Sequence, residues 1–421
     1  MAQVFIEETT LTAIGDAIRG KEGTTELVPV IDMATRITNL PSGGGGGGNE
    51  PTDEELVFTG TCSYLFSENK WNWFIAKYGS RITTTNVSNC QSLFHNSNNL
   101  KTIPFQINVA NCSSFGNLLN SCYKLSVCPK VRGAILWNTS TSFDSMLRLN
   151  YDIRDIEDLF TPEMIEGFST VKVTSAYSTV KATSFYGLYS LRKIPSWWYK
   201  FRVSPESTAY PSASYTIYYN MLNNCYSIDT AENIPVWTCS GAQTSNMFSS
   251  SFDRCNRLKD ITFETNEDGT PIVVKWKSQT IDLSKNVGYY FTSDSANSFA
   301  TNVNNRNRFV TSNCYNSGIT EDKLIYNDET YQLLKDDLDS YAVDCGGSSL
   351  GGLYSRYNHD SAVNTINSLP DTSAYLATAG GTNTIKFKGT SGSLTDGGAI
   401  NTLTEEEIAV ATAKGWTVTL Q

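Results

Sequence analysis

The stretch Phe94-His95-Asn96-Ser97-Asn98-Asn99-Leu100-Lys101-Thr102-Ile103 shows the pattern that decides the fold. Every third position is occupied in the order apolar, small, apolar, apolar. The same pattern returns in five further copies, which start at Leu119, Leu147, Phe185, Leu222 and Phe252. Measured at the third slot, the six copies lie 25, 28, 38, 37 and 30 residues apart. A period of about 20–50 residues is typical of stacked repeats, in which no single unit can bury its own apolar face. The pattern therefore predicts an α/β repeat protein, an elongated solenoid with a broad outer surface.

Composition supports a folded chain that does not bind nucleic acid. The 421 residues exceed the usual size of one core, and 40% of them are hydrophobic. The formal net charge is −10 and no run of basic residues is present, which argues against a nucleic-acid partner. No apolar stretch approaches the ~20 residues of a membrane helix, and the N-terminus lacks the features of a secretion signal. We expect synthesis in a cytoplasm and no membrane partner.

The cysteines favour a reduced core over disulfides or metal sites. None of the ten shows Cys-x-x-Cys spacing, and the chain has only two histidines. Cys122, Cys225 and Cys255 occupy the second slot of their copies, where the pattern suggests a small apolar residue. We therefore expect no metal and no cofactor.

The N-terminal region is interpreted as a helical anchor on a tether. Two short amphipathic helices are predicted within residues 1–42, and six glycines, Gly43 to Gly48, follow them. The candidate anchor residues are Leu11, Ile14, Ile18, Val30, Met33 and Ile37. Helices this short are marginal alone, so they must dock on another protein or another copy, or else pack on the repeats of their own chain.

Six segments are predicted along the chain. They are the anchor (1–42), a Gly-rich linker (43–53), a strand-like N-terminal cap (54–85), the repeats (86–262), a strand meander with loops (263–355), and a C-terminal repeat and α/β cap (356–421). The meander begins with a hairpin turn at Glu267-Asp268-Gly269. Near the C-terminus, Thr404 and Glu407 form a predicted capping box for a helix through Ala413, followed by a strand from Trp416.

Several segments resemble known sequences. The repeat Phe252-x-x-Cys255-x-x-Leu258-x-x-Ile261 resembles the BspA-like leucine-rich repeats of bacterial surface proteins. The stretch from Leu11 to Arg19, followed by Met33-Ala34 and the glycine run, is similar to tail-associated proteins of phages that infect Gram-positive gut bacteria. Further stretches that look like repeat proteins of such phages are residues 71–75, 269–273 and 411–416. The resemblance implies a leucine-rich-repeat solenoid; because the two longest repeats exceed the usual 20–29 residues, we expect them to carry insertions.

The same resemblance implies a virion component, of the tail-fibre or baseplate type, that attaches the phage to its host. Its partners would be other virion proteins through the N-terminal helices, and a host-surface glycan or protein. A homo-oligomer, for example a trimer, is compatible with this layout. Two alternatives remain: a capsid or tail decoration protein without receptor binding, and a bacterial surface adhesin.

The sequence offers no catalytic constellation. Neither His95 nor His359 is accompanied by a nucleophile elbow or a zinc-helix motif, so we predict a non-enzymatic protein. A pair of carboxylates for sugar hydrolysis stays open, because their separation is a three-dimensional quantity. Aromatic residues of the long copies are the candidate recognition surface, since their flat rings suit sugar or protein contact. They are Trp197, Trp198, Tyr199, Tyr215, Tyr218 and Tyr219. The alternative is that they pack in the core or against neighbouring subunits.

Overall fold

The computed structural model describes most of the chain between residues 50 and 420. The described residues are 50–284 except 179, 226, 227, 254, 256, 257 and 259, then 357, 359–387 and 403–420, with the backbone of two short strands, β8 (Ile325–Tyr326) and β9 (Tyr331–Gln332). The predicted anchor, with Leu11, Ile14, Ile18, Val30, Met33 and Ile37, lies outside these residues, as do the glycine run and nearly all of 286–355.

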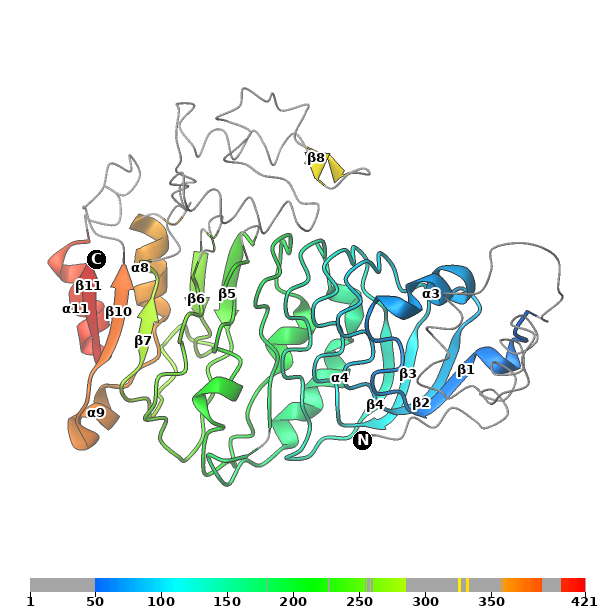
Figure 1. The fold of residues 1–421 in the computed structure, drawn as a ribbon. Helices are drawn as coiled ribbons and strands as arrows, with labels where there is room; N and C mark the ends of the chain where they lie inside the picture. Colours follow the sequence, from blue (N-terminus) through cyan, green and yellow to red (C-terminus); the bar gives the residue numbers. More distant parts are fainter. Residues whose placement is uncertain are drawn as a thin grey trace.

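The fold combines short parallel sheets with short helices. A four-stranded sheet holds β1 (Val57–Thr61), β2 (Thr83–Asn89), β3 (Ile107–Cys112) and β4 (Val131–Ile135) in that order, all parallel. A parallel pair follows, β5 (Thr230–Ile234) with β6 (Asp260–Phe263), and then the parallel sheet β11 (Trp416–Leu420), β10 (Asn383–Phe387), β7 (Thr280–Asp282). Figure 1 shows successive turns of chain lying side by side from β1 to β11.

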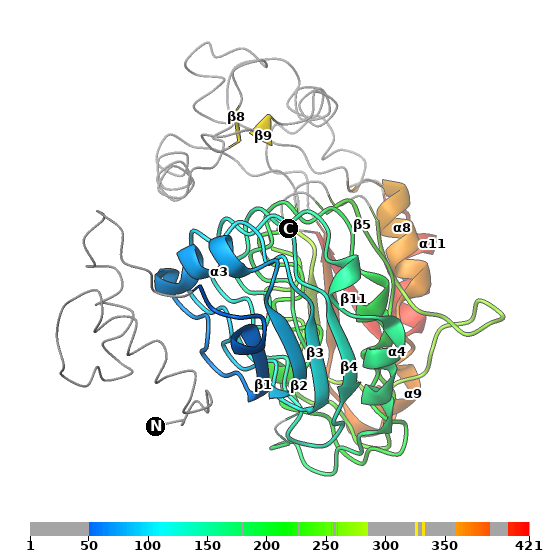
Figure 2. The same ribbon diagram turned by 90° about the vertical axis from the view of Figure 1, so that its right-hand side faces the viewer.

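Helices are short and lie at the margins of this stack. In the described ranges, the α-helices are α3 (Asn72–Tyr78), α4 (Pro162–Glu166), α8 (His359–Ser368), α9 (Ser373–Ala379) and α11 (Glu405–Ala413). The 3-10 helices are η1 (Glu54–Leu56), η2 (Asn69–Trp71), η3 (Glu157–Leu159), η4 (Gly167–Thr170), η5 (Ser196–Lys200) and η6 (Ala213–Tyr215). In Figure 2, α4, α8 and α11 lie along one side of the stack. Among the described residues, no helix has the length and apolar content that crossing a bilayer requires.

At the first slot, backbone hydrogen bonds join four of the copies to the copy that follows. The amide of Phe94 donates to Leu118 O at 3.0 Å, and that of Leu119 donates to Met146 O at 2.9 Å. The same bond recurs at Phe185 and Leu222, at 2.9 and 2.7 Å. One such bond precedes copy one, since Phe66 N donates to Leu93 O at 2.9 Å, so the N-terminal cap already contains one turn of this kind. Burying an unpaired backbone N–H or C=O group costs free energy, and these hydrogen bonds between copies avoid that cost.

The chain bends at left-handed residues that recur four positions apart. Ser92 and Asn96 have φ of 55° and 59°, and Asn220 and Asn224 have φ of 49° and 61°. Equivalent pairs are Tyr64 with Glu68, Asn117 with Ser121, and Ser145 with Leu149. Asparagine tolerates this conformation better than most residues that carry a Cβ. The abundance of uncharged polar residues thus has a backbone cause in addition to a surface one.

In five of the six copies the second slot holds a side-chain hydrogen-bond donor, which corrects the expectation of a merely small apolar residue; copy four has Leu188 there. The donor side chain reaches back to the first-slot carbonyl of the preceding turn. The bonds are Ser97 to Phe66 O (2.8 Å), Cys122 to Phe94 O (2.9 Å), Asn150 to Leu119 O (2.8 Å), Cys225 to Phe185 O (3.0 Å) and Cys255 to Leu222 O (3.0 Å). Burial raises the pKa of Cys122 to about 12, so its thiol keeps the proton that it donates.

The apolar slots build a continuous core that runs from Leu56 to Trp416. Phe94 and Ile103 are 0% and 5% exposed. Rings stack between neighbouring turns, as Phe115 does on Phe143 at 4.9 Å with an interplanar angle of 7°. Each fully buried side chain of this size stabilises the fold by about 1.5–3 kcal/mol. Because each ring contacts the turn before and the turn after it, this stabilisation depends on stacking.

Two local expectations are wrong. The aromatic run of the N-terminal cap is not strand-like, since α3 contains Trp73 and Phe74. In residues 263–284, the described start of the predicted meander, antiparallel pairing across the turn is limited to the bridge of Thr265 with Pro271, and the chain then pairs in parallel, β7 with β10. The reason is that Val274, Trp276 and Ile281 are at most 3% exposed and extend the same core, which a free-standing hairpin would leave uncovered. Further along, the two short strands β8 and β9 pair antiparallel. The C-terminal capping box of Thr404 and Glu407, α11 and the final strand are confirmed.

Candidate ligand-binding groove

Three of the six predicted recognition residues lie in the core. Trp197, Trp198 and Tyr218 are each 0% exposed. Their polar atoms are satisfied internally: Trp197 Nε1 donates to Ile156 O at 2.9 Å, and the Tyr218 hydroxyl donates to Pro235 O at 2.5 Å. The expectation that they form a recognition surface is therefore wrong. The inserted segments of the long copies, such as η5, fold back onto the stack and bury their aromatic side chains.

The other three predicted residues are half-buried. Tyr199 packs edge-on against Trp198 at 5.4 Å, and burial raises the pKa of its hydroxyl. The Lys181 ammonium lies 4.3 Å from the centre of the Tyr215 ring, a cation–π contact. Tyr219 alone of the six lines a groove in the outer surface.

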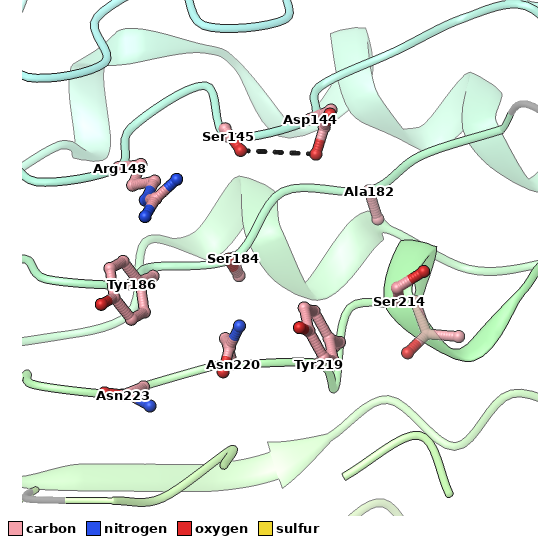
Figure 3. Close-up of a pocket in the computed structure, with 11 residues that line it drawn as sticks. Asp144, Ser145, Arg148, Ala182, Ser184, Tyr186, Ser214, Tyr219, Asn220 and Asn223 are labelled. Carbon is pink, nitrogen blue, oxygen red and sulfur yellow. Dashed lines mark hydrogen bonds between the residues drawn. The ribbon is translucent and has the colours of Figure 1, made fainter. Parts of the chain in front are cut away.

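This groove has a volume of about 440 Å³ and crosses three successive turns. The first turn contributes Asp144 and Arg148, the second Tyr186, and the third Tyr219 and Asn223 (Figure 3). The remaining lining residues are small and mostly polar: Ser145, Ala182, Ser184, Ser214, Thr216 and Asn220. Its volume lies within the range of small-molecule sites, about 300–1,000 Å³.

A change of register between the second and third turns accompanies the groove. Ala182 N donates to Tyr215 O at 3.2 Å, and Phe185 N donates to Met221 O at 2.9 Å. Between these two bonds the second turn advances by three residues, from Ala182 to Phe185, whereas the third turn advances by six, from Tyr215 to Met221. The extra residues cannot all pair with the ladder, so the chain after η6 bows away from the regular path. Thr216 and Tyr219, which belong to this bowed segment, form part of the groove wall.

Arg148, Tyr186 and Asn223 occupy the same place in three consecutive copies. Each directly follows its first-slot residue and precedes a residue with positive φ: Leu149, Gly187 or Asn224. The ladder bonds Leu149 N to Tyr186 O (3.0 Å) and Gly187 N to Asn223 O (2.8 Å) hold the three turns in this alignment. The guanidinium of Arg148 lies 5.1 Å from the centre of the Tyr186 ring. A row of outward side chains thus runs along the stack at the groove.

Of the two charged residues that line the groove, Asp144 has an ion-pair partner and Arg148 does not, among the described residues. Asp144 Oδ2 lies 3.1 Å from Lys181 Nζ, so the acidic residue of the lining is neutralised by a lysine at its side. Arg148 is exposed, and within the part of the chain that the structure describes no carboxylate lies within ion-pair distance of it. Its charge is therefore available to a ligand.

The groove offers hydrogen bonds, two phenol rings and a cation. Neither histidine lines it: burial lowers the pKa of His95 in copy one, and His359 belongs to α8, where it contacts Glu407 at 3.2 Å. In the described ranges no cluster of three or more His, Cys, Asp or Glu side chains is placed to hold a metal ion. The arrangement can bind and orient a polar ligand.

The sequence interpretation missed Arg148, Tyr186 and Asn223. A signal was present, because the residue after the first slot of each copy is polar or aromatic throughout, from His95 in copy one to Asp253 in copy six. The three-residue period of the apolar slots does not by itself say which intervening positions face outward.

No family model, curated protein or solved structure matches this chain.

Proposed function

We propose that this chain is a non-enzymatic attachment protein of a phage virion, and that its repeat domain binds a glycan of the host surface in the groove. The observation that carries the proposal is the combination of Tyr186, Tyr219, Arg148 and Asn223 in one groove. Sugar rings pack against tyrosine faces, and sugar hydroxyls need several convergent donors and acceptors. The virion assignment rests on the resemblance of the N-terminal and repeat segments to phage-encoded proteins.

The dimensions of the groove favour a saccharide over a protein partner. A stable protein interface buries about 800 Å² on each side and has an apolar centre. Here the centre is polar, and the largest aromatic candidates, Trp197 and Trp198, are inside the core. A few sugar units fill a volume of about 440 Å³, whereas a folded protein surface does not enter it.

The rest of the layout belongs to the same proposal. The stacked turns represent leucine-rich repeats with insertions in the long copies, residues 1–42 fix the chain to the particle, and the glycine run lets the repeat domain swing. Assembly as a homo-oligomer would multiply weak contacts with a repetitive surface, because linked sites bind with high effective concentration.

Binding of the full chain to host cells tests this function. We expect specific adhesion that Tyr219→Ala weakens by about tenfold, the effect of losing ~1.4 kcal/mol of contact. Tyr177→Ala is the matched control, because Tyr177 is 95% exposed and does not line the groove. Full-chain protein that neither binds host cells nor blocks infection would contradict the proposal and support a decoration role. Adhesion unchanged by Tyr219→Ala would exclude the groove.

A further inference from the structure

We infer that the groove selects a saccharide carrying an anionic substituent, a carboxylate or a phosphate, and that Arg148 binds the anionic group. This inference rests on the proposed function and names the ligand class of the same groove.

The first argument is the state of Arg148. Several cations elsewhere on the surface are paired with carboxylates, for example Lys130 with Asp158 at 2.9 Å and Arg202 with Glu264 at 2.6 Å, and exposed Lys275 donates to the carbonyl of Ser240. Arg148 instead lies over the Tyr186 ring, which orients a guanidinium without neutralising it. An arginine held in this way keeps its donor edge for a carboxylate or phosphate, both of which it can bind through two parallel hydrogen bonds.

The second argument is the neutrality of the rest of the lining. Asp144, the acidic member, is paired with Lys181 and so repels an anion less. Facing it are neutral donors, the amides of Asn220 and Asn223 and the hydroxyl of Ser184. Figure 3 shows the Asn220 amide between the rings of Tyr186 and Tyr219, with the Arg148 guanidinium on the first turn, next to the Tyr186 ring. An anionic group at Arg148 would therefore place the attached sugar ring between these side chains.

The overall charge limits how dense the anionic groups can be. With a net charge of −10, the protein repels a polyanion such as nucleic acid at long range. A glycan with one anionic group per few sugars suffers less of this repulsion and still satisfies Arg148. The class is thus a sparsely charged glycan.

Calorimetric titration of the full chain distinguishes the ligand classes. The probes are a neutral dextran oligosaccharide, a hyaluronan oligosaccharide with carboxylates on alternate sugars, and a dextran oligosaccharide that carries a single phosphate. We expect at least one anionic probe to bind tenfold or more tightly than dextran, and the stronger of the two identifies the anionic group. Arg148→Gln should remove this preference, Arg148→Lys should keep part of it, and binding of the anionic probe should weaken with added salt.

Lys70→Gln is the matched control, because it removes one positive charge from an exposed residue within η2, outside the groove. It should leave all three affinities unchanged. Equal losses of neutral and anionic binding in Arg148→Gln would assign that residue a merely structural role and overturn the inference. So would dextran binding as tight as that of both anionic probes.

The failure of this inference is distinguishable from failure of the proposed function. If host-cell adhesion depends on Tyr219 but not on Arg148, the anionic class is wrong and glycan attachment stands. If the full chain shows no adhesion and binds no probe, both are wrong. Thermal unfolding of each variant, expected to match that of the unmodified chain, verifies that the stack is intact.

Discussion

The thiol of Cys225 donates to the carbonyl oxygen of Phe185, one turn back, at 3.0 Å. Both residues are 0% exposed, so no solvent molecule replaces this bond if it is lost. Serine, cysteine and asparagine fill the same role in the other copies, whereas Leu188 occupies the slot in copy four without a side-chain donor. The small residue of the repeat is thus a link between turns as well as a spacer.

Replacing the donor at this slot should cost stability. Cys225→Val keeps an apolar side chain of similar volume but removes the thiol donor, so that the Leu188 amide, at 3.1 Å, is the remaining donor to the Phe185 carbonyl. We expect a loss of about 0.5–1.5 kcal/mol in the free energy of unfolding, the net contribution of one hydrogen bond. Cys225→Ser retains a donor and should lose less. Chemical denaturation of the three proteins gives the comparison, and a valine variant as stable as the parent would show that the bond contributes nothing.

Gly133→Ala should destabilise the four-stranded sheet. Gly133 has φ of 111°, and a Cβ there would overlap the carbonyl oxygen of its neighbour Val109 in β3. We expect a loss above about 2 kcal/mol, because the left-handed backbone alone costs about 1–2 kcal/mol. Gly269→Ala is the control, since Gly269 has φ of 80° but open space around its Cα. Equal melting temperatures for the two variants would contradict the steric argument.

The contribution of Lys414 to the free energy of unfolding should increase in mild alkali. Its Nζ donates to Ile366 O at 2.8 Å and to Asn367 O at 2.6 Å, in the last turn of α8. Burial lowers the pKa of Lys414 to about 8, although Asp371 partly opposes the shift. Between this value and the unfolded pKa of about 10.4, the Lys414 side chain holds more protons in the unfolded chain than in the folded one, so its contribution to the free energy of unfolding increases with pH. Buried thiols with raised pKa, such as that of Cys122, contribute with the opposite sign.

Between pH 8 and about 10.4, the Lys414 contribution to the free energy of unfolding should increase by at most about 1.4 kcal/mol per pH unit. Denaturation series at pH 7.5 to 9.5 on the parent protein and on Lys414→Met measure it. Contributions from other titrating groups occur in both proteins and cancel in the difference. Parallel stability curves for the two proteins would show that Lys414 is not the group responsible.

Deletion of residues 1–42 tests the proposed anchor. We expect the shortened protein to keep the repeat stack and its glycan binding, because the described core begins at Leu56. It should no longer incorporate into phage particles, which immunoblotting of purified virions would measure. Incorporation at the level of the full chain would place the attachment elsewhere.

Local signals in the sequence were sufficient for some elements. The capping box of Thr404 and Glu407 was predicted correctly because both partners lie within four residues and the bonds form inside one turn of helix. The burial of first-slot residues such as Phe94 also followed from spacing, since an apolar residue at every copy must face a common interior. The turn at Glu267-Asp268-Gly269 was predicted correctly, since Thr265 and Pro271 pair antiparallel across it. The extent of its arms was not, because a turn motif does not determine which strand the residues beyond it will pair with, and β6 pairs with β5.

The candidate site depended on contacts between copies. Tyr218 and Tyr219 are adjacent in sequence, yet the first is 0% exposed and the second lines the groove. Composition does not indicate which of two neighbouring tyrosines is buried and which is exposed. The direction of each side chain depends on the bowed segment between η6 and Met221. Arg148 and Asn223 were missed for a related reason, since they come together only when copies three to five are aligned.

The sequence by itself determined the apolar and small positions of the repeat, its uneven length from copy to copy, and the cap at the C-terminus, because each depends on residues close together in the chain. Only the tertiary structure decided that Trp197 and Trp198 are core residues, that the small slot donates to the preceding turn, and that Arg148, Tyr186 and Asn223 form one row. The physical reason is that these properties arise from hydrogen bonds and packing between turns about 25 to 38 residues apart, where the register of stacking selects which side chains meet.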